Sequence, residues 1–291
     1  MQTAIKKARA MIEAMEYIRA FKDKIVVVKL GGSILEDLEL QRKLLKDIAF
    51  MKIVGMRPVI VHGGGKHISQ AMENSGIEPQ WVHGRRYTDK RTLTIVERTL
   101  IHDVNSGICK ALKELGCSTM ALHSLGSCVI FAKPLEMKTE EGRRLDLGLV
   151  GEVDKVNSEL IINLCAAGTI PVIAPIGIDK NGQKLNINAD SAAGMVAASV
   201  KAEKFVLLSD THGILMDIND PESRISSLTE TQVKELIREG VISAGMLPKV
   251  EACFTALDGG VGKAHTIDGR IEHSLLLEIY TEQGIGTQII R

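Results

Sequence analysis

The chain has 291 residues, of which 45% are hydrophobic and 25% charged, and this composition is typical of a globular protein with a sizeable core. Lys and Arg together number 36, as do Asp and Glu, so no positive field is available to hold nucleic acid or an anionic membrane surface. Five cysteines without a CxxC pair predict reduced thiols, and with no apolar run of about 18 residues we expect a cytoplasmic protein.

Residues 4–20 form the first predicted element, an amphipathic helix. Acidic residues at Glu13 and Glu16 argue against an organellar presequence, which would avoid acids. The apolar stripe must be buried against a partner subunit or against the rest of the same chain. Its members recur at helical spacing: Ile5, Ala8, Ile12, Met15 and Ile18.

Short β-branched runs alternate with longer periodic segments through the rest of the chain. This alternation predicts an α/β protein with an open, mainly parallel sheet sandwiched by helices. Shorter strand-like pieces in residues 127–154 predict hairpins, and the polar cluster at residues 177–184 predicts a boundary between two lobes. The expected division is therefore 1–22, 23–182 and 183–291. The strand-like runs are Ile25–Leu30, Pro58–His62, Pro171–Ala174 and Lys204–Ser209.

Two of these strands run directly into glycines. The first ends at Lys29-Leu30-Gly31-Gly32-Ser33 and the second at His62-Gly63-Gly64-Gly65. Glycines let phosphate oxygens approach backbone N–H groups, and a lysine at a strand end supplies a positive charge. One such junction is more typical of a tight turn, but two of them favour an anion site. A histidine at a strand end is more often a hydrogen-bonded structural residue, so His62 is given no catalytic role.

Two further polar clusters precede helical patterns in the second half. In Asn186-Ile187-Asn188-Ala189-Asp190, either Asn188 or Asp190 could be the helix N-cap, and a buried carboxylate here could hold lysine charges in position. In Gly245-Met246-Leu247-Pro248-Lys249 the proline suits a helix start, where a lysine is unfavourable unless an anion accompanies it. The P-loop and dinucleotide-binding glycine patterns are absent.

Together these segments resemble the amino-acid kinase family over nearly all of residues 24–291, and within it the N-acetylglutamate kinases. The resemblance rests on the four motifs above and on Gly84-Arg85-Arg86-Tyr87-Thr88. It implies ATP-dependent phosphorylation of the side-chain carboxylate of N-acetyl-L-glutamate in arginine biosynthesis, with Mg²⁺ carried by the nucleotide and no metal held by the protein. A carboxylate with a reference pKa of about 4.3 is already ionised, so positioning and charge stabilisation matter more than a general base.

The resemblance also implies a role for each motif residue. Lys29 and Lys249 would stabilise the transition state, with Asp190 orienting both. The acyl amino acid would contact Gly64, Gly65, Arg86 and Asn186, and the nucleotide would contact Gly31, Gly32, Ser209, Asp210 and Met246. Arg85 stands where relatives have an apolar residue, so either guanidinium could face the α-carboxylate of the substrate. Met246 is equally typical of core packing.

Arginine-sensitive N-acetylglutamate kinases carry a similar N-terminal helix, which interlaces dimers into a hexamer, a trimer of dimers. They also resemble this chain in the turn Gly284-Ile285-Gly286-Thr287. The resemblance implies feedback inhibition by arginine, which would favour a ring with its lobes held apart. It leaves a PII-type signalling protein open as a partner, because some relatives bind one. The implied arginine contacts are Tyr17, Lys201, His265, Glu278 and Gly284.

Two rival functions follow from the same motifs. A sibling kinase acts on acetylaminoadipate, which is one methylene longer, a difference worth only about 1–3 kcal/mol in a binding pocket. A catalytically silent amino-acid sensor would keep the fold without the reaction. The presence of Lys29, Asp190 and Lys249 together favours an active kinase.

Overall fold

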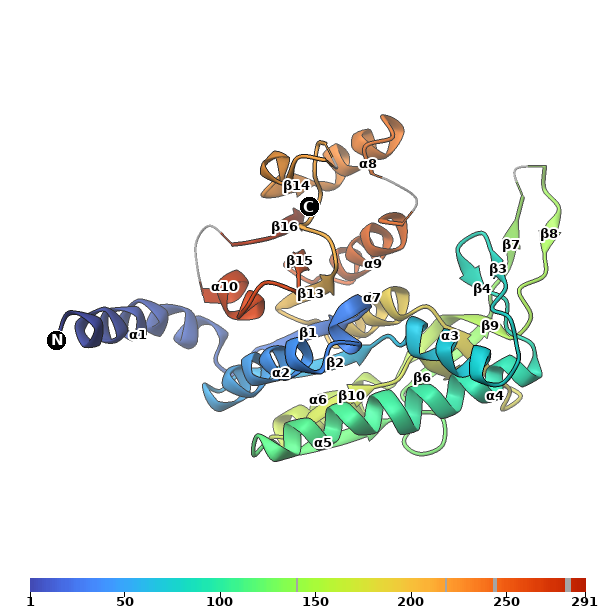
Figure 1. Ribbon diagram of the computed structural model, residues 1–291, viewed down its shortest axis with the longest axis horizontal. Helices are drawn as coiled ribbons and strands as arrows, with labels where there is room; N and C mark the ends of the chain where they lie inside the picture. The colour runs from blue at the N-terminus through green and yellow to red at the C-terminus, as the bar shows by residue number, and fades with distance from the viewer. Residues whose placement is uncertain (140, 218, 243–244, 281–283) are drawn as a thin grey trace.

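The central feature of the computed structural model is an eight-stranded sheet with helices on both faces (Figure 1). The structure describes residues 1–139, 141–217, 219–242, 245–280 and 284–291. The strands of this sheet are β1 (Ile25–Leu30), β2 (Arg57–His62), β5 (Thr119–Leu122), β10 (Ile170–Ile173), β13 (Lys204–Ser209), β14 (Ser227–Thr229), β15 (Lys263–Asp268) and β16 (Thr287–Ile290). Their order is β14-β16-β15-β13-β1-β2-β10-β5.

The sheet is mainly parallel, as the sequence predicts. Every neighbouring pair from β15 through β13, β1, β2 and β10 to β5 is parallel. β16 pairs antiparallel with β15, and β14 lies parallel to β16 at the edge. The four predicted strand-like runs are all confirmed, although β2 begins one residue earlier, at Arg57, and β10 at Ile170.

Two hydrophobic cores lie on opposite faces of the sheet, because successive side chains of a strand point in opposite directions. Val27 packs in the core that includes α6, α7 and α9, whereas Val26 and Val28 pack in the core that includes α2, α5 and α10. Burial on both faces explains why the strand runs are continuously apolar. The helices are α1 (Gln2–Phe21), α2 (Leu38–Ile53), α3 (Gly65–Asn74), α4 (Lys90–Arg98), α5 (Ser106–Glu114), α6 (Ser158–Ala166), α7 (Ala189–Ser199), α8 (Glu230–Arg238), α9 (Leu247–Asp258) and α10 (Ser274–Tyr280).

Smaller elements complete the fold. A 3₁₀ turn, η1 (Gly32–Leu35), follows β1, and a second, η3, spans Pro221–Ser223. A π-helical segment, η2 (Thr99–Asn105), joins α4 to α5 without a break. Four short strands form two hairpins: β3 (Trp81–Val82) with β4 (Arg85–Arg86), and β7 (Met137–Lys138) with β8 (Arg144–Leu145).

A four-stranded barrel closes beside the central sheet and is not foreseen by the sequence analysis. It consists of β6 (Ile130–Pro134), β9 (Val150–Val156), β11 (Ile176–Ile178) and β12 (Lys184–Ile187). The antiparallel pairing of β6 with β9, and of β7 with β8, confirms the hairpins predicted in residues 127–154. β11 and β12 pair across the expected boundary at residue 182. The division into lobes stays a prediction, and the central sheet takes strands from both expected lobes.

The N-terminal helix α1 confirms the amphipathic element and projects from the body of the molecule (Figure 1). Only its C-terminal end makes aromatic contacts, where Tyr17 packs edge-to-face on Tyr280 and the Lys204 ammonium lies 5.0 Å from the centroid of the Phe21 ring, among the residues that the structure describes. Nowhere in the described ranges is a helix both long and apolar enough to span a bilayer. Several large apolar side chains of the helix remain exposed: Ile5, Met11, Ile12 and Met15.

Candidate active site

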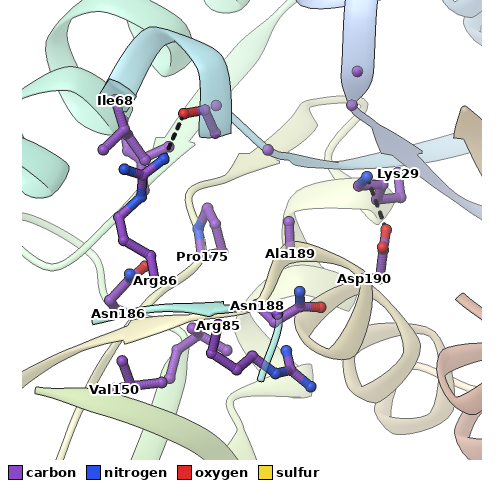
Figure 2. Close-up of a pocket in the computed structure, with 18 of the residues that line it drawn as sticks. Lys29, Ile68, Arg85, Arg86, Val150, Pro175, Asn186, Asn188, Ala189 and Asp190 are labelled. Atoms are coloured by element: carbon purple, nitrogen blue, oxygen red, sulfur yellow. Dashed lines mark hydrogen bonds and ion pairs between the residues drawn. The ribbon is translucent and has the colours of Figure 1, made fainter. Parts of the chain in front are cut away.

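A cavity of about 220 Å³ lies where β1 and β2 end and α3 and α7 begin. The carboxyl ends of parallel strands are the usual place for ligands in open α/β sheets. Figure 2 shows Lys29 and Asp190 at one side of this cavity and Arg86 at the other. The cavity is lined by most of the predicted catalytic and substrate residues and by two of the predicted nucleotide residues: Lys29, Gly64, Gly65, Arg86, Asn186 and Asp190, with Gly31 and Gly32.

Two lysines from distant segments converge on one buried carboxylate. Lys29 Nζ forms an ion pair with Asp190 Oδ1 at 2.8 Å. Lys249 Nζ donates a hydrogen bond to Asp190 Oδ2 at 3.1 Å. Lys29 is the penultimate residue of β1, Asp190 lies in the first turn of α7, and Lys249 lies in the first turn of α9. The fold therefore brings together the three residues assigned to catalysis.

Burial and charge act against each other in this triad. Burial alone would raise the pKa of Asp190, but the charges of Lys29 and Lys249 outweigh it and lower the pKa to about 2. Burial lowers the pKa of Lys29, and the attraction of Asp190 offsets part of that change. The carboxylate is thus ionised at neutral pH and holds positive charge at the edge of the cavity.

The two polar residues at the start of α7, Asn188 and Asp190, have different roles. Asn188 is the N-cap, because its Oδ1 accepts a hydrogen bond from Ser191 N at 3.0 Å. The Asp190 carboxylate is therefore free to bind the two lysines. At the start of α9, Pro248 occupies the first turn as the sequence predicts.

The glycine turn after β1 is packed too tightly for a side chain. A Cβ atom on Gly31 would lie 2.2 Å from Lys29 Nζ, and one on Gly32 would lie 2.1 Å from Asp210 Oδ1. Gly32 also has a φ of +65°, which favours glycine. The Asp210 carboxylate accepts hydrogen bonds from the backbone N and the Oγ of Ser33, both at 3.0 Å. Asp210 thus joins the loop after β13 to the turn after β1.

Arg86 enters the cavity from β4 and is 6% exposed. Its Nη2 donates to Gly65 O at 2.9 Å and to Ser69 Oγ at 2.7 Å. Its guanidinium carbon lies 4.6 Å from the centroid of the exposed Trp81 ring. Nη1 faces Met72 Sδ at 3.2 Å, a weak acceptor, so this arm keeps donor capacity for a carboxylate.

The neighbouring Arg85 also lines the cavity, but its guanidinium points in a different direction from that of Arg86 (Figure 2). The β3–β4 pairing sets Trp81 opposite Arg86 and Val82 opposite Arg85. Asn186 also lines the cavity, and its Nδ2 donates to Thr88 Oγ1 at 3.1 Å. Arg86 is consequently the better held of the two guanidinium groups.

A second cavity of about 240 Å³ lies beyond the turn after β13. Asp210 and Met246 line it, and Met246 also packs against the main core, which confirms the packing interpretation; its contact with a nucleotide stays a prediction. Ser209 is buried beneath this cavity, with its Oγ 2.9 Å from Thr211 Oγ1. The wall includes apolar side chains such as Ile242, which suit the flat face of a base.

A third cavity, of about 880 Å³, separates the end of α1 from the C-terminal part of the chain. It brings together four of the five residues predicted to contact arginine: Tyr17, His265, Glu278 and Gly284. Lys201 is not among its lining residues, because it lies exposed just after α7 with a φ of +49°. Lys204, at the start of β13, lines the cavity instead.

Sequence reasoning missed several residues of the active site. Ser69 follows Gly65 by one helical turn, so the helical spacing was a usable signal for its position beside Arg86. Trp81 gives no such signal, because it reaches the cavity only through the β3–β4 hairpin. The contact of Ser33 with Asp210 spans 177 positions and could not be foreseen from spacing.

Comparison with known proteins places these motifs in a family. The sequence profile of the amino acid kinase family matches residues 24–268. The acetylglutamate kinase of Symbiobacterium thermophilum is 45% identical over 291 residues, which cover 100% of this chain and 99% of that protein. The acetylglutamate kinase of Methanocaldococcus jannaschii is 44% identical and covers 99% of this chain and 97% of its own length.

Solved structures share the fold. N-acetylglutamate synthase from Neisseria gonorrhoeae, complexed with coenzyme A and N-acetyl-glutamate, superposes with a TM-score of 0.85 at 25% identity. The match covers 98% of this chain and 63% of the synthase. Carbamate kinase from Giardia lamblia bound to AMP-PNP superposes with a TM-score of 0.66 at 16% identity, covering 92% of this chain and 98% of that one.

Proposed function

The chain belongs to the amino acid kinase family and is a kinase, and from this premise we propose that it transfers the γ-phosphoryl group of ATP to the side-chain carboxylate of N-acetyl-L-glutamate. The product would be N-acetyl-L-glutamyl 5-phosphate, an intermediate on the way to arginine. Full-length relatives named acetylglutamate kinase at 42–45% identity support this choice of substrate.

One observation carries the proposal. Lys29 and Lys249 both contact the Asp190 carboxylate at the edge of a cavity that the glycine turns line. Both reactants are anions, so the main obstacle to reaction is the repulsion between them. Two ammonium groups held by a buried carboxylate are preorganised to stabilise the charge on the migrating phosphoryl group. The backbone N–H groups of Gly31 and Gly64 would contribute further donors.

Mg²⁺ is proposed to arrive with ATP, bound to its phosphate oxygens. The nearby carboxylates are already engaged, Asp190 by two lysines and Asp210 by Ser33. Mg²⁺ commonly keeps several waters and relies on substrate phosphates for part of its coordination. The residues present therefore suit a metal that enters and leaves with the nucleotide.

Replacing Arg86 by alanine should raise KM for acetylglutamate about 10- to 100-fold and change kcat less. The guanidinium would bind the α-carboxylate, and a charge-assisted hydrogen bond contributes about 1.5–3 kcal/mol. Because this carboxylate does not react, the interaction is made equally in the ground and transition states. Steady-state kinetics with varied acetylglutamate measure the effect.

Arg85→Ala is the matched control, since it removes the same charge from the adjacent residue of β4. We expect KM to change less than about threefold in this variant, because its guanidinium points elsewhere. If Arg85→Ala raised KM and Arg86→Ala did not, the carboxylate clamp would belong to Arg85.

The choice of acceptor is tested by ADP formation with acetylglutamate and with acetylaminoadipate at equal concentrations. We expect kcat/KM to be at least about tenfold higher with acetylglutamate, as one methylene is worth about 1–3 kcal/mol. A higher value with acetylaminoadipate would move the assignment to the sibling kinase. No ADP formation with either acceptor would favour the silent sensor.

A second part of the proposal is feedback inhibition by arginine in a hexameric assembly. The apolar stripe of α1 is largely uncovered, with Ile12 65% and Ile5 46% exposed. A helix of this kind needs a partner for its apolar face, and a second copy of the chain offers the same stripe. We propose that α1 helices interlace dimers into a hexamer.

The third cavity has the chemistry to bind an amino acid with a cationic side chain. Glu278 accepts hydrogen bonds from His265 Nδ1 at 2.6 Å, from Ile285 N at 2.7 Å and from Gly286 N at 3.0 Å, and a carboxylate has about four acceptor positions. His265 is 2% exposed, and its Nε2 has no partner among the described residues. Because Nδ1 donates to Glu278, Nε2 is an acceptor that a guanidinium could satisfy. Lys204 and Lys263 line the same cavity and could hold a carboxylate.

Deletion of residues 1–20 should abolish inhibition by millimolar arginine and reduce the assembly from hexamer to dimer. The deletion removes Tyr17, which lines the proposed arginine cavity, together with the apolar stripe. Light scattering reports the mass and initial rates report the inhibition. The uninhibited kcat should stay within about threefold, because α1 contributes no residue to the first cavity.

A point variant tests the apolar stripe alone, without the other changes that deletion of residues 1–20 introduces. Ile12→Glu should dissociate the assembly as the deletion does, whereas Glu13→Gln on the polar face should leave it intact. A hexamer that survives both the deletion and Ile12→Glu would remove the regulatory proposal. The kinase assignment would be unaffected.

A further inference from the structure

A buried polar network lies directly behind the glycine turn that follows β2. His62 ends β2, and Asn105 ends the π-helical segment η2, and both residues are 0% exposed. Asn105 Nδ2 lies 3.0 Å from His62 Nε2 and donates to Val172 O at 2.9 Å. His62 Nδ1 lies 2.8 Å from Gly63 O. The kinase mechanism makes no use of any of these groups.

The hydrogen-bond partners decide the tautomer of His62. An amide with its oxygen turned toward Val172 O would face another acceptor, so the orientation of Asn105 is set. The amide nitrogen of Asn105 can donate hydrogen bonds but cannot accept them, so His62 Nε2 must be the acceptor. The ring proton lies on Nδ1 and is donated to the carbonyl of Gly63. Burial lowers the pKa of His62 to about 4, and the charges of His67 and His123 act in the same direction, so the ring is neutral.

Gly63 is a junction between catalytic elements. Its N–H donates to Leu30 O at 2.7 Å, next to the turn after β1. A Cβ on Gly63 would lie 3.8 Å from both Gly31 Cα and Ala189 Cβ. The turn that follows Lys29 and the first turn of α7, which carries Asp190, therefore both lie close to Gly63. A change in the orientation of the peptide after Gly63 would therefore shift the positions of both neighbouring elements.

The π-helical segment η2 makes two kinds of contact with the glycine turn after β2: apolar contacts at Gly64 and a hydrogen bond to His62. In a π turn the hydrogen bonds connect residues five apart, so Leu100 and Asn105 lie on the same side. A Cβ on Gly64 would lie 2.7 Å from Leu100 Cδ2 and 3.5 Å from Val104 Cγ2. The segment thus packs apolar side chains on Gly64 and places an amide on His62.

We propose that Asn105 is a positioning residue of the phosphoryl-transfer site, acting through His62 on the carbonyl of Gly63. It fixes the turn from which Gly64 and Gly65 face the cavity. The inference rests on the proposed kinase activity but assigns a role to residues that never touch a substrate. Misplacement of catalytic groups by about 1 Å can cost on the order of 100-fold in rate.

The test compares Asn105→Ala and Asn105→Asp in the full chain. We expect kcat to fall about 10- to 100-fold in both variants, with KM for ATP and acetylglutamate within about threefold. In Asn105→Asp the introduced carboxyl group and His62 share one proton, which can satisfy the contact with His62 but leaves the one with Val172 O without a donor. As pH rises through the pKa of that pair, the proton is lost and the contact with His62 also becomes acceptor against acceptor. The kcat of this variant relative to the unmodified chain should therefore fall with rising pH, whereas the ratio for Asn105→Ala should stay flat.

A purely structural role would lower Tm in both variants without a pH-dependent ratio of kcat. Asn157→Asp is the matched control, because Asn157 caps α6 through its side-chain oxygen, which aspartate retains. Its kcat should be unchanged. A pH-independent ratio for Asn105→Asp, or near-normal kcat in both Asn105 variants, would overturn the inference.

Nitrogen-15 spectra of the His62 ring provide a readout that is independent of turnover. The unmodified chain should show protonated Nδ1 and bare Nε2, and Asn105→Ala should show a mixture of tautomers. If the unmodified chain formed no ADP, the proposed function would fail, and these spectra would still decide whether Asn105 sets the tautomer. An unchanged tautomer in Asn105→Ala would contradict the inference even if the enzyme were active.

Discussion

Replacing Lys29 or Lys249 by alanine is expected to lower kcat by roughly 100- to 1,000-fold, with smaller changes in KM. Each ammonium group contacts the Asp190 carboxylate beside the cavity, at 2.8 and 3.1 Å. The charge that they stabilise develops fully only in the transition state, so their loss appears mainly in kcat. Asp190 keeps one lysine in each variant, and the fold should persist.

Lys24→Ala is the matched control for Lys29, because it removes a lysine just before the opposite end of the same strand. Lys24 makes an exposed ion pair with Glu203 at 3.1 Å, and exposed pairs contribute about 0–1 kcal/mol. Its kcat should be unchanged. Circular dichroism establishes that each variant is folded. Turnover within about threefold of normal in Lys29→Ala or Lys249→Ala would remove that residue from the catalytic assignment.

Asp190→Asn is expected to lower kcat by about 100-fold and to move the alkaline limb of the pH–rate profile toward lower pH. Burial already lowers the pKa of Lys29, and Asp190 is the group that opposes this effect most strongly. Without the carboxylate the pKa of Lys29 falls further, so the protonated, active form is lost at a lower pH. The profile of kcat between about pH 6 and 10 measures the shift.

The difference in the free energy of unfolding between the unmodified chain and Asp190→Asn should depend on pH in a defined direction. The pKa of Asp190 is lowered from 3.8 to about 2 in the folded chain. The carboxylate therefore stabilises the fold above about pH 4, and this contribution is lost as pH falls toward about 2. Burial of charged Lys29 opposes it at neutral pH, so the kinetic effect should exceed the thermal one.

Asp179→Asn is the matched control for the substitution at Asp190. Asp179 accepts hydrogen bonds from Asn181 N and Gln183 N, both at 2.8 Å, in an exposed turn. Asparagine keeps an acceptor oxygen, so both stability and kcat should be retained. A pH–rate profile in Asp190→Asn that overlays the normal one would show that Asp190 does not control the charge of Lys29.

The sequence by itself determined the fold class and the chemistry of the turns. Continuous β-branched runs such as Ile25–Leu30 and Lys204–Ser209 can be buried on both faces only in a parallel sheet between helices, and both are strands with those bounds. The glycines after β1 and β2 predicted close approach of backbone to an anion. Helical periodicity predicted α1, because an apolar stripe on a helix depends only on local spacing.

Only the tertiary structure decided how two neighbouring arginine side chains are held at the site. Arg85 and Arg86 are adjacent in a strand, so their side chains leave the backbone on opposite sides, and the sequence cannot say which one will be fixed by neighbouring groups. Both line the cavity, and hydrogen bonds to Gly65 and Ser69 of α3 hold Arg86 in place. The same limit explains why the sequence analysis named Lys201 as an arginine contact, whereas Lys204 lines the third cavity. The positions of both residues depend on where α7 ends and β13 begins.

The contacts that make the site were likewise beyond sequence spacing. Lys249 meets Asp190 across 59 positions, Ser33 meets Asp210 across 177, and Asn105 meets His62 across 43. Motif resemblance implied that Asp190 orients both lysines, and the structure supplies the two contacts, at 2.8 and 3.1 Å. Local propensity concerns neighbours a few residues apart, whereas these contacts follow from the order in which the parallel strands lie side by side. The sequence thus determined which groups were available, and the strand order determined which of them meet.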